Sequence, residues 1–378
     1  MSYRPGEWLM ECLQSVMAQA DEVVLVDNGS AGEEASRLGG SVGARVVRSP
    51  ANVGFAAGVA LGLAHSRGEL VGLLNDDAVA GPNWLDAAAV ALEDPSVAAV
   101  TPKVILAGWF REVVVPKQRL TSVEVDGCRT KLNLLVGAGL ATARSYGSTV
   151  TNDLETSATG VRPFYVPVAG PDHDPHIKVN GEATPGGPVV RILNHAGSYL
   201  RAYGAAGEYG RGAPDDGRFD APAERFGFSG TAPVFRTETL HRIGGFAPEF
   251  FAYNEDTDWC LRAHLVGLRV MYDPAATVIH RLSATSGGPD STLVRFLHER
   301  NALLCLLRNA PSEVAGRHFL ARLARHPWDR VSRAVASMTP WAVSSRRTAR
   351  KTWVRSPRDV WNAWAERDLH WDDGPVRV

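Results

Sequence analysis

Two hydrophobic periodicities alternate along the N-terminal third of the chain. Apolar positions recur at helical spacing from Pro5 to Ala20, which predicts a helix. Short apolar runs predict strands at 22–26, 44–48, 70–74 and 97–104, and helical stretches are predicted at 56–66 and 82–92. Strands that alternate with helices indicate an α/β protein with a mostly parallel, doubly wound sheet.

The pattern changes between residues 107 and 226, where glycine, proline and β-branched residues dominate. Short apolar runs at 164–168 and 189–193 predict strands there, so we expect a β-rich insert. Helical spacing returns at 237–243, 256–266 and 293–307, and a strand is predicted at 276–279. We therefore divide the chain into segments 1–106, 107–226, 227–310 and 311–378.

Composition narrows the class of protein. With 378 residues, 45% hydrophobic and 21% charged, the chain predicts one large or two fused globular domains. A net charge of −1 gives no general attraction to nucleic acid. The cysteines are far apart and form no CxxC pair, so we expect all of them to be buried and reduced; they are Cys12, Cys128, Cys260 and Cys305. No apolar run is long enough to span a membrane and no secretion signal is visible, which predicts a cytoplasmic protein.

The segment after Pro311 is strongly basic. Its arginines greatly outnumber its acidic residues, and tryptophans are interleaved with them. One interpretation is a helical appendage with a solvated basic face. The alternative is peripheral contact with an anionic membrane surface, at the inner face of the membrane, or with a phosphate-bearing acceptor.

Paired carboxylates follow the predicted strand 70–74. Neighbouring charges of like sign repel, and a divalent cation removes that cost because hard cations seek carboxylate oxygen. We expect Asp77 to bind Mg²⁺ or Mn²⁺ that bridges the two phosphates of a nucleotide donor, and Asp76 to contact the ribose or the donor sugar. An acidic turn without a metal is the alternative.

A second polar group follows the first predicted strand. Ligands of open α/β sheets lie outside the carboxyl ends of the strands, where Asp27 is placed. Its carboxylate can accept the imide N–H of a uracil or thymine base, or it can cap a turn. The loop from Asn52 to Phe55 precedes a helix whose N-terminal amides can hold a nucleotide, and Gly54 permits close approach of the backbone.

A third acidic group follows the aromatic stretch 250–253. An apolar wall raises the pKa of a carboxylate, which suits a general base, and Asp256 is that candidate. Asp258, and Asp256 equally, can instead be helix N-terminal residues favoured by the dipole. His280 follows the predicted strand 276–279, where it is either structural or a further metal ligand.

These residues resemble the inverting family 2 glycosyltransferases of the GT-A fold, particularly the bacterial rhamnosyltransferase-like branch. The resemblance covers roughly residues 2–310 and rests on an ordered set of stretches. They are VVLVDNGS (23–30), NVGFAAG (52–58), LLNDDA (73–78), FSGTAPVFR (228–236), IGGFAPEFFAYNEDTDWCLR (243–262) and PAATVIHRLSAT (274–285).

The resemblance implies a mixed GT-A sheet with a Rossmann-like nucleotide-binding half (1–106) and an acceptor and catalytic half (227–310). It implies that Asp256 is the catalytic base and that Asp77 and His280 bind the metal. The implied donor-binding residues are Tyr3, Asp27, Asn52, Gly54, Asp76 and Gly230. The implied acceptor and sugar pocket comprises Thr231, Glu255 and Trp259. Arg300 and Asn301 match a recurrent Arg-Asn pair on the following helix.

Three features depart from the family's pattern. The family begins with an apolar strand, whereas Met1 stands where that strand should end, so either the sequence starts late or the donor site is incomplete. Ala60 replaces a common asparagine beside the nucleotide. The insert 107–226 is longer than expected, which suggests a role in acceptor specificity.

We therefore predict transfer of a sugar, with inversion, from a nucleotide diphosphate sugar to an acceptor hydroxyl. Donor candidates are dTDP-rhamnose, UDP-hexoses and UDP-galactofuranose, and the acceptor would be a glycan, a lipid-linked glycan or a small molecule. A catalytically impaired binding relative is one alternative. A nucleotidyltransferase is another, although it usually carries a Gly-rich basic loop near its start. Nucleic acid is not an expected partner.

Overall fold

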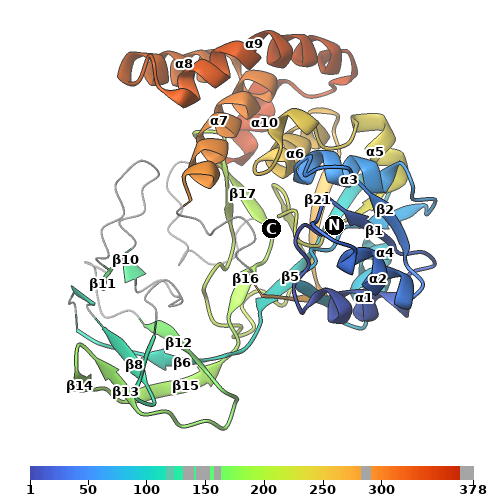
Figure 1. Cartoon of the computed structure of the whole chain (residues 1–378). Coiled ribbons are helices and arrows are strands. Elements are labelled where there is room, and N and C mark those ends of the chain that lie inside the picture. Colours follow the sequence, from blue (N-terminus) through green and yellow to red (C-terminus); the bar gives the residue numbers. More distant parts are fainter. Residues whose placement is uncertain are drawn as a thin grey trace.

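The computed structural model describes residues 1–116, 119–120, 122–130, 140–141, 154–156, 163–281 and 291–366 (Figure 1). A central sheet is flanked by helices from the N-terminal segment. Small β-sheets extend from one side of this body, and a layer of C-terminal helices covers one end. The predicted α/β class with a β-rich insert and a helical C-terminal appendage is confirmed.

The central sheet is mixed. Its strand order is β19 (Ala223–Arg225), β21 (Arg269–His280), β5 (Val97–Leu106), β20 (Val234–Arg236) and β3 (Leu70–Gly72), with β16 (Leu193–His195) also paired to β5 and β4 (Ala78–Ala80) to β21. Only β21 and β5 run parallel within it. The expectation of a mostly parallel sheet was wrong, because β20 enters antiparallel between β5 and β3.

A parallel pair, β1 (Val24–Asp27) and β2 (Arg45–Arg48), lies beside this sheet. Ser2 pairs with the end of β1: its N–H donates to the Val26 carbonyl (2.8 Å) and its carbonyl accepts the Asn28 N–H (2.8 Å). The Met1 amino group donates to the Leu74 carbonyl (3.4 Å). The first two residues thus lie between β1 and the segment that follows β3.

The N-terminal helices are α1 (Leu9–Met17), α2 (Glu34–Ser41), α3 (Phe55–Leu63) and α4 (Trp84–Ala91). Helices α1, α3 and α4 occur where the apolar spacing predicts helices, but each is shorter than predicted. Helix α2 was not predicted. The α4 helix packs on β21 and β5, and Trp84 Nε1 donates to the Ala232 carbonyl (3.2 Å).

Much of the segment 107–226 builds separate small sheets. One contains β6 (Trp109–Val113), β12 (Phe164–Val168) and β15 (Gly186–Val190), and another contains β8 (Val123–Val125), β9 (Cys128–Thr130), β13 (Ile177–Val179) and β14 (Glu182–Ala183). A third contains β7 (Arg119–Leu120), β10 (Leu140–Ala141) and β11 (Leu154–Thr156). The first two of these sheets share a core that includes Val113, Phe164 and Val123. Cys128 is exposed in this region, contrary to prediction, whereas the other three cysteines are buried.

The rest of that segment returns to the central body. Strands β16 and β19 join the main sheet, and a hairpin of β17 (Ser198–Arg201) and β18 (Ala206–Glu208) pairs with β22 (Ala365–Glu366). At the turn of this hairpin, a Cβ on Gly204 would lie 2.5 Å from Leu306 and 2.9 Å from the Ala302 carbonyl. The hairpin is therefore packed tightly against the helix that carries those residues.

The C-terminal half contains α5 (Thr237–Ile243), η2 (Pro248–Phe250), α6 (Glu255–Leu265), α7 (Thr292–Asn309), α8 (Ser312–Arg325), α9 (Arg330–Ala349), η3 (Arg350–Thr352) and α10 (Pro357–Trp364). Buried ion pairs join α6 to α7: Asp258 Oδ2 lies 2.6 Å from Arg308 Nη1 and 3.0 Å from Arg262 Nε. Asp258 is thus a structural residue. Among the described residues, no helix combines the length and apolarity needed to cross a bilayer.

Candidate functional site

Asp77 and His280 meet at the edge where β4 and β21 pair. Ala78 is the register partner of His280, which places Asp77 beside the last residue of β21. His280 Nε2 lies 3.1 Å from Asp77 Oδ1, although 203 residues separate them in sequence. Both residues are nearly buried, with His280 6% and Asp77 8% exposed. The structure therefore brings the two predicted metal ligands together.

Asn194, which sequence reasoning missed, sets the orientation of the His280 ring. Its Oδ1 lies 2.8 Å from His280 Nδ1, and an amide oxygen can only accept. Nδ1 is therefore the protonated nitrogen, and a neutral His280 presents the lone pair of Nε2 toward Asp77. A fixed tautomer of this kind is typical of histidines that bind metal ions.

The residues present fit a divalent cation. A neutral imidazole lone pair and a carboxylate face each other across 3.1 Å, and two acceptors need a cation or a proton between them. No cluster of three or more His, Cys, Asp or Glu side chains surrounds one point in the described part of the chain. Mg²⁺-type ions often take one or two protein carboxylates and complete their shell with substrate phosphates and water.

Asp76 directly precedes Asp77 in the turn between β3 and β4, and its side chain is half-buried. Its Oδ2 accepts a hydrogen bond from Ser2 Oγ at 2.6 Å. Burial raises the pKa of the Asp76 carboxyl above its usual range. Ser2 is thus part of this turn, which the sequence did not indicate.

Asp27 is fully buried at the end of β1. Its Oδ1 accepts from the Ser30 N–H (2.9 Å), while Arg48 Nε lies 3.5 Å from Oδ2. Oδ2 has no hydrogen-bond donor within the described residues. Tyr3 lies close by, since the N–H of Arg4 donates to Ser30 Oγ (3.1 Å). Within the described residues, Asp27 Oδ2 therefore has an ion-pair neighbour in Arg48 but no hydrogen-bond donor.

The loop before α3 is tied to the end of β1. Asn28 Nδ2 donates to Asn52 Oδ1 (3.1 Å) and to the Gly54 carbonyl (3.2 Å), and Asn52 Oδ1 also accepts from the Gly54 N–H (2.9 Å). Gly54 has φ +86°, and a Cβ there would lie 2.5 Å from the Phe251 carbonyl oxygen. Glycine is required because the loop touches the segment that leads into α6.

Asp256 lies in the first turn of α6 and points toward the loop before β20. Its Oδ2 accepts from the Gly230 N–H (3.2 Å), and its Oδ1 accepts from the Thr257 N–H (2.6 Å). Burial raises the pKa of Asp256 to about 6, although these hydrogen bonds oppose the rise. A carboxylate with this pKa can accept a proton near neutral pH.

Glu255 and Thr231 also line this region. Burial and the neighbouring Asp256 raise the pKa of Glu255 well above its usual range, and its Oε2 has no hydrogen-bond partner in the described structure. Thr231 is buried, and its hydroxyl lies 3.2 Å from Ser229 Oγ. Trp259 differs: it is fully buried, packs on Phe235 and donates to the Gly244 carbonyl (3.0 Å). The structure thus places Trp259 in the core rather than at a pocket.

The backbone before α6 is held in an unusual conformation. Phe251, Tyr253 and Asn254 have φ of +65°, +70° and +63°, a region that side-chain-bearing residues avoid. Asn301 Nδ2 is shared among the carbonyls of Phe250 (2.9 Å), Ala252 (2.8 Å) and Tyr253 (2.6 Å). Arg300 Nη2 donates to Phe250 (2.7 Å) and Glu249 (3.1 Å). The Arg-Asn pair of α7 therefore positions the loop that leads into α6, whose first turn carries Asp256.

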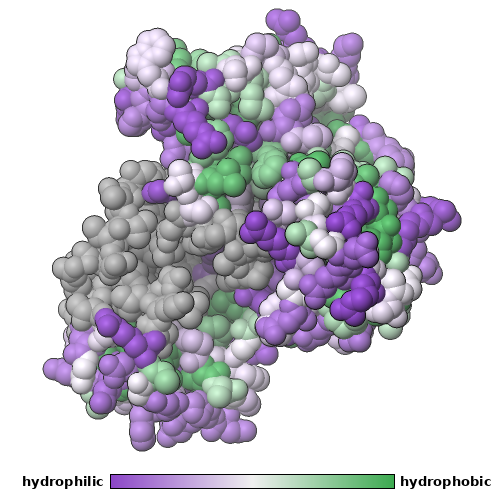
Figure 2. All heavy atoms as spheres, viewed as in Figure 1, coloured by the Kyte–Doolittle hydropathy of each residue, from purple (hydrophilic) through white to green (hydrophobic). Residues whose placement is uncertain are grey.

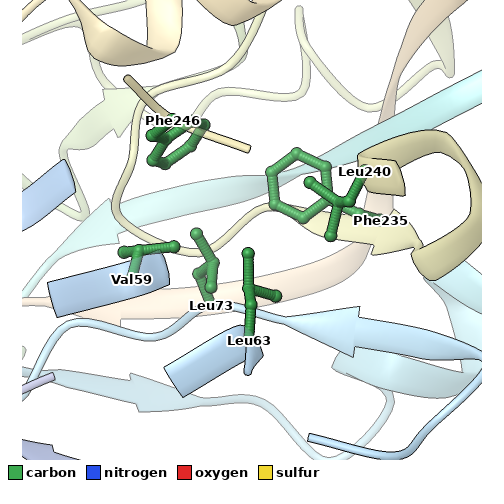
Figure 3. Close-up of a pocket in the computed structure, with 6 residues that line it drawn as sticks. All are labelled: Val59, Leu63, Leu73, Phe235, Leu240 and Phe246. Carbon is green, nitrogen blue, oxygen red and sulfur yellow. The ribbon is translucent and has the colours of Figure 1, made fainter. Parts of the chain in front are cut away.

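A small apolar pocket lies apart from these polar groups (Figure 3). It is lined by Val59, Leu63, Leu73, Phe235, Leu240 and Phe246, and it is too small to hold a water molecule. None of the side chains that line it can bind charge or move a proton. We assign it to imperfect packing between α3, α5 and β20.

The sequence missed Asn194, His195 and Glu208, all of which lie near His280 or Asp256. Asn194 and His195 follow the predicted strand 189–193, and a polar pair after an apolar run is the signal that identified Asp27 and Asp77. Glu208 carries no comparable sequence signal.

Known proteins resemble the chain in part of its sequence and in its fold. Residues 2–145 match the family model described as Glycosyl transferase family 2. A solved structure described as GalNAc-T7 with UDP, GalNAc and Mn²⁺ aligns with a TM-score of 0.56 at 11% identity, over 94% of this chain and 53% of that one. The chain thus spans about half the length of that relative, and the likeness is one of fold. No curated protein matches the chain.

Two further solved structures show weaker similarity. Mannosyltransferase PcManGT from Pyrobaculum calidifontis, in complex with GDP-Man and Mn²⁺, aligns with a TM-score of 0.40 at 15% identity, over 92% of this chain and 71% of that one. S. aureus TarS 1-349, in complex with UDP-GlcNAc, aligns with a TM-score of 0.41 at 13% identity, over 93% and 89%. The alignment with GalNAc-T7 shows that the chain has the GT-A fold, and residues 2–145 match Glycosyl transferase family 2.

Proposed function

We propose that the protein is a metal-dependent glycosyltransferase that moves a sugar from a nucleotide diphosphate donor to an acceptor hydroxyl with inversion. UDP- and dTDP-linked sugars, including dTDP-rhamnose, are the candidate donors. Segments 1–106 and 227–310 would form the donor and acceptor halves of the enzyme. The match to the glycosyltransferase family model and the GT-A fold support the reaction class.

One observation carries this proposal: the contact of His280 Nε2 with Asp77 Oδ1, with the ring fixed by Asn194. Asp77 and His280 would hold Mn²⁺ or Mg²⁺. When bound, such an ion supplies positive charge that offsets the negative charge of a leaving diphosphate.

The chain's own residues would perform the other tasks. Asp27 Oδ2 would accept the imide N–H of the base, and the amides after Gly54 would face the phosphates. Asp256 would take the proton from the acceptor hydroxyl as that oxygen attacks the anomeric carbon. Attack from the side opposite the leaving diphosphate gives inversion. Asn301 would keep the carboxylate of Asp256 in place, because it holds the backbone of the loop before α6.

The experiment is a nucleotide-release assay with a panel of UDP-, dTDP- and GDP-linked sugars and Mn²⁺. The proposal expects release of a nucleoside diphosphate that depends on both metal and Asp256, so that Asp256→Asn loses turnover. Conversion of a donor to a nucleoside triphosphate and a sugar 1-phosphate, seen only when pyrophosphate is added, would instead identify a nucleotidyltransferase. Binding of nucleotides without turnover of any donor would identify a catalytically impaired relative.

We also propose that the C-terminal helices contact an anionic membrane surface. Leu320 and Trp328 are 65% and 83% exposed, and Arg317, Arg325 and Arg330 are exposed around them. Figure 2 shows hydrophilic residues mixed with apolar ones over this layer. Tryptophan and arginine at a surface suit the interface of a lipid bilayer, where the ring inserts and the cation meets phosphate.

Co-sedimentation with vesicles tests this contact. Vesicles of phosphatidylcholine with added phosphatidylglycerol should pull down the protein, and pure phosphatidylcholine should not. The double variant Leu320→Ser and Trp328→Ser should weaken the binding. Equal recovery with both kinds of vesicle, or none with either, would reject the membrane contact.

A further inference from the structure

A second group of polar side chains lies beside the candidate base, on elements that carry none of the donor-binding residues. Glu208 ends β18, and Arg211 follows it and forms an ion pair with it. His298 lies on α7, whose later turns pack against the β17–β18 hairpin at Gly204. These elements therefore converge on one place in the fold.

Glu208 lies close to several groups of the site. The charge of Glu208 raises the pKa values of Asp256, His195 and His298. In turn, His280 lowers the pKa of Glu208. The Glu208 side chain is 19% exposed. Burial opposes its ionisation, but the ion pair with Arg211 outweighs that effect and lowers the pKa of Glu208. Glu208 is therefore a carboxylate at neutral pH, with oxygens that accept hydrogen bonds.

His195 is a further polar group near Glu208, whose charge acts on the pKa of its ring. It is fully buried, and neither ring nitrogen has a hydrogen-bond partner among the residues that the structure describes. Buried polar atoms are almost always paired, with protein, ordered water or a bound molecule. A polar ligand or an ordered water in contact with the ring would satisfy His195.

Two adjacent aromatic rings, those of Tyr253 and His298, also lie near the start of α6. The rings of Tyr253 and His298 lie 4.4 Å apart at 31°, and both side chains are partly exposed. Tyr253 belongs to the loop that Asn301 holds, three residues before Asp256. Aromatic rings offer an apolar face with a polar edge, which matches the mixed surface of a sugar ring.

We propose that Glu208, Arg211, His298 and Tyr253 form a subsite that binds a sugar unit of the acceptor, with Glu208 accepting hydrogen bonds from its hydroxyls. This inference rests on the proposed glycosyltransferase function. The acceptor oxygen must reach Asp256, and the subsite adjoins the start of α6, because Tyr253 packs on His298 and Asn254 Nδ2 donates to the His298 carbonyl (3.4 Å). The subsite lies partly on the segment 107–226, so this segment contributes to acceptor specificity.

Saturation-transfer difference NMR with methyl glycosides of the common hexoses, with UDP and Mg²⁺ present, tests the subsite. Wild type should show saturation of at least one glycoside. Glu208→Gln should weaken its binding about tenfold, as expected for loss of one charge-assisted hydrogen bond. Glu208→Asp should retain part of it. Glu182→Gln removes an exposed carboxylate of the same segment and should change nothing.

Nucleotide binding separates the two proposals. The UDP-induced rise in melting temperature should be the same in wild type, Glu208→Gln and Glu182→Gln, which also shows that each variant is folded. A UDP response with no glycoside binding to wild type, or with equal binding to Glu208→Gln, would overturn the subsite and leave the donor site standing. If UDP does not raise the melting temperature of the wild-type protein, that result would count against the proposed function.

Discussion

Asn301 Nδ2 donates to the carbonyl of Tyr253 at 2.6 Å, which joins the middle of α7 to the left-handed backbone that precedes α6. The same amide reaches the carbonyls of Phe250 and Ala252. Asn301 is fully buried, so these three carbonyls would have no solvent to replace it. The geometry of the candidate base thus depends on a residue that never faces a substrate.

Replacing Asn301 with alanine should therefore destabilise the protein. Buried carbonyls left without a donor cost roughly 1–3 kcal/mol, and the strained backbone before α6 would relax. We expect a lower melting temperature and a slower turnover with little change in donor KM. Asn362→Ala, at an exposed position of α10, is the matched control. Similar melting temperatures for the two variants would show that the Asn301 contacts are not stabilising.

The candidate base should give the reaction a characteristic pH dependence. Burial raises the pKa of Asp256 to about 6, and only the ionised form can take a proton. The kcat/KM for the acceptor should rise with pH through about 6 and level off above it. Asp256→Asn should reduce kcat by about 10²–10⁴-fold while nucleotide binding survives. A flat profile between pH 5 and 8 or an active Asn variant would remove Asp256 from this role.

Glu255 should reduce stability at neutral pH. Its pKa in the folded protein lies well above the ordinary value of 4.5, because it is buried beside Asp256. A raised pKa contributes stability that is full below about pH 4.5 and is lost as pH rises through the folded-state pKa. Glu255→Gln should therefore be more stable than wild type at pH 8, because glutamine carries no charge that must be buried.

Melting temperatures of wild type and Glu255→Gln at pH 4.5 and pH 8 measure this effect. The difference between the two proteins should grow as pH rises. Glu182→Gln, on the exposed β14, should follow wild type at both pH values. A lower melting temperature for Glu255→Gln at pH 8 would indicate that the carboxylate has a partner that stabilises its charge.

Asn194 should control metal affinity without binding the metal. Its Oδ1 holds His280 Nδ1 at 2.8 Å, and loss of such an outer partner typically weakens metal binding about 10–100-fold. Asn194→Leu should therefore weaken Mn²⁺ binding, measured by titration calorimetry in the presence of UDP. Asn194→Asp keeps an acceptor at the same place and should retain affinity. Equal affinities for the Leu and Asp variants would mean that the ring needs no such partner.

The sequence predicted those site residues that follow apolar strands. Asp27, Asp77 and His280 each stand at the end of a hydrophobic run, and the topology of an α/β sheet gathers strand ends at one edge. The structure does place Asp77 against His280. The α/β class was likewise predictable, because helical and strand periodicities alternate clearly in the N-terminal third.

Other parts of the site depend on tertiary contacts that spacing does not encode. Trp259 lies three residues after Asp256, which suggests a shared helix face, but α6 is buried on nearly every side and Trp259 packs in the core. Glu208 reaches the site only because the β17–β18 hairpin docks on α7. The direction of β20 could not be predicted either, since a three-residue apolar strand carries no directional signal.

The most direct test of the account is nucleotide binding with and without metal. Melting temperatures would be measured with UDP and dTDP, each alone and with Mn²⁺, for wild type and for His280→Ala. A ligand at 100 times its Kd stabilises a protein by about 2.7 kcal/mol. The account predicts a clear rise for wild type only when a nucleotide and Mn²⁺ are present together, and a reduced rise for His280→Ala. No rise with any nucleotide, or the same rise without metal, would contradict a donor site built on Asp77 and His280.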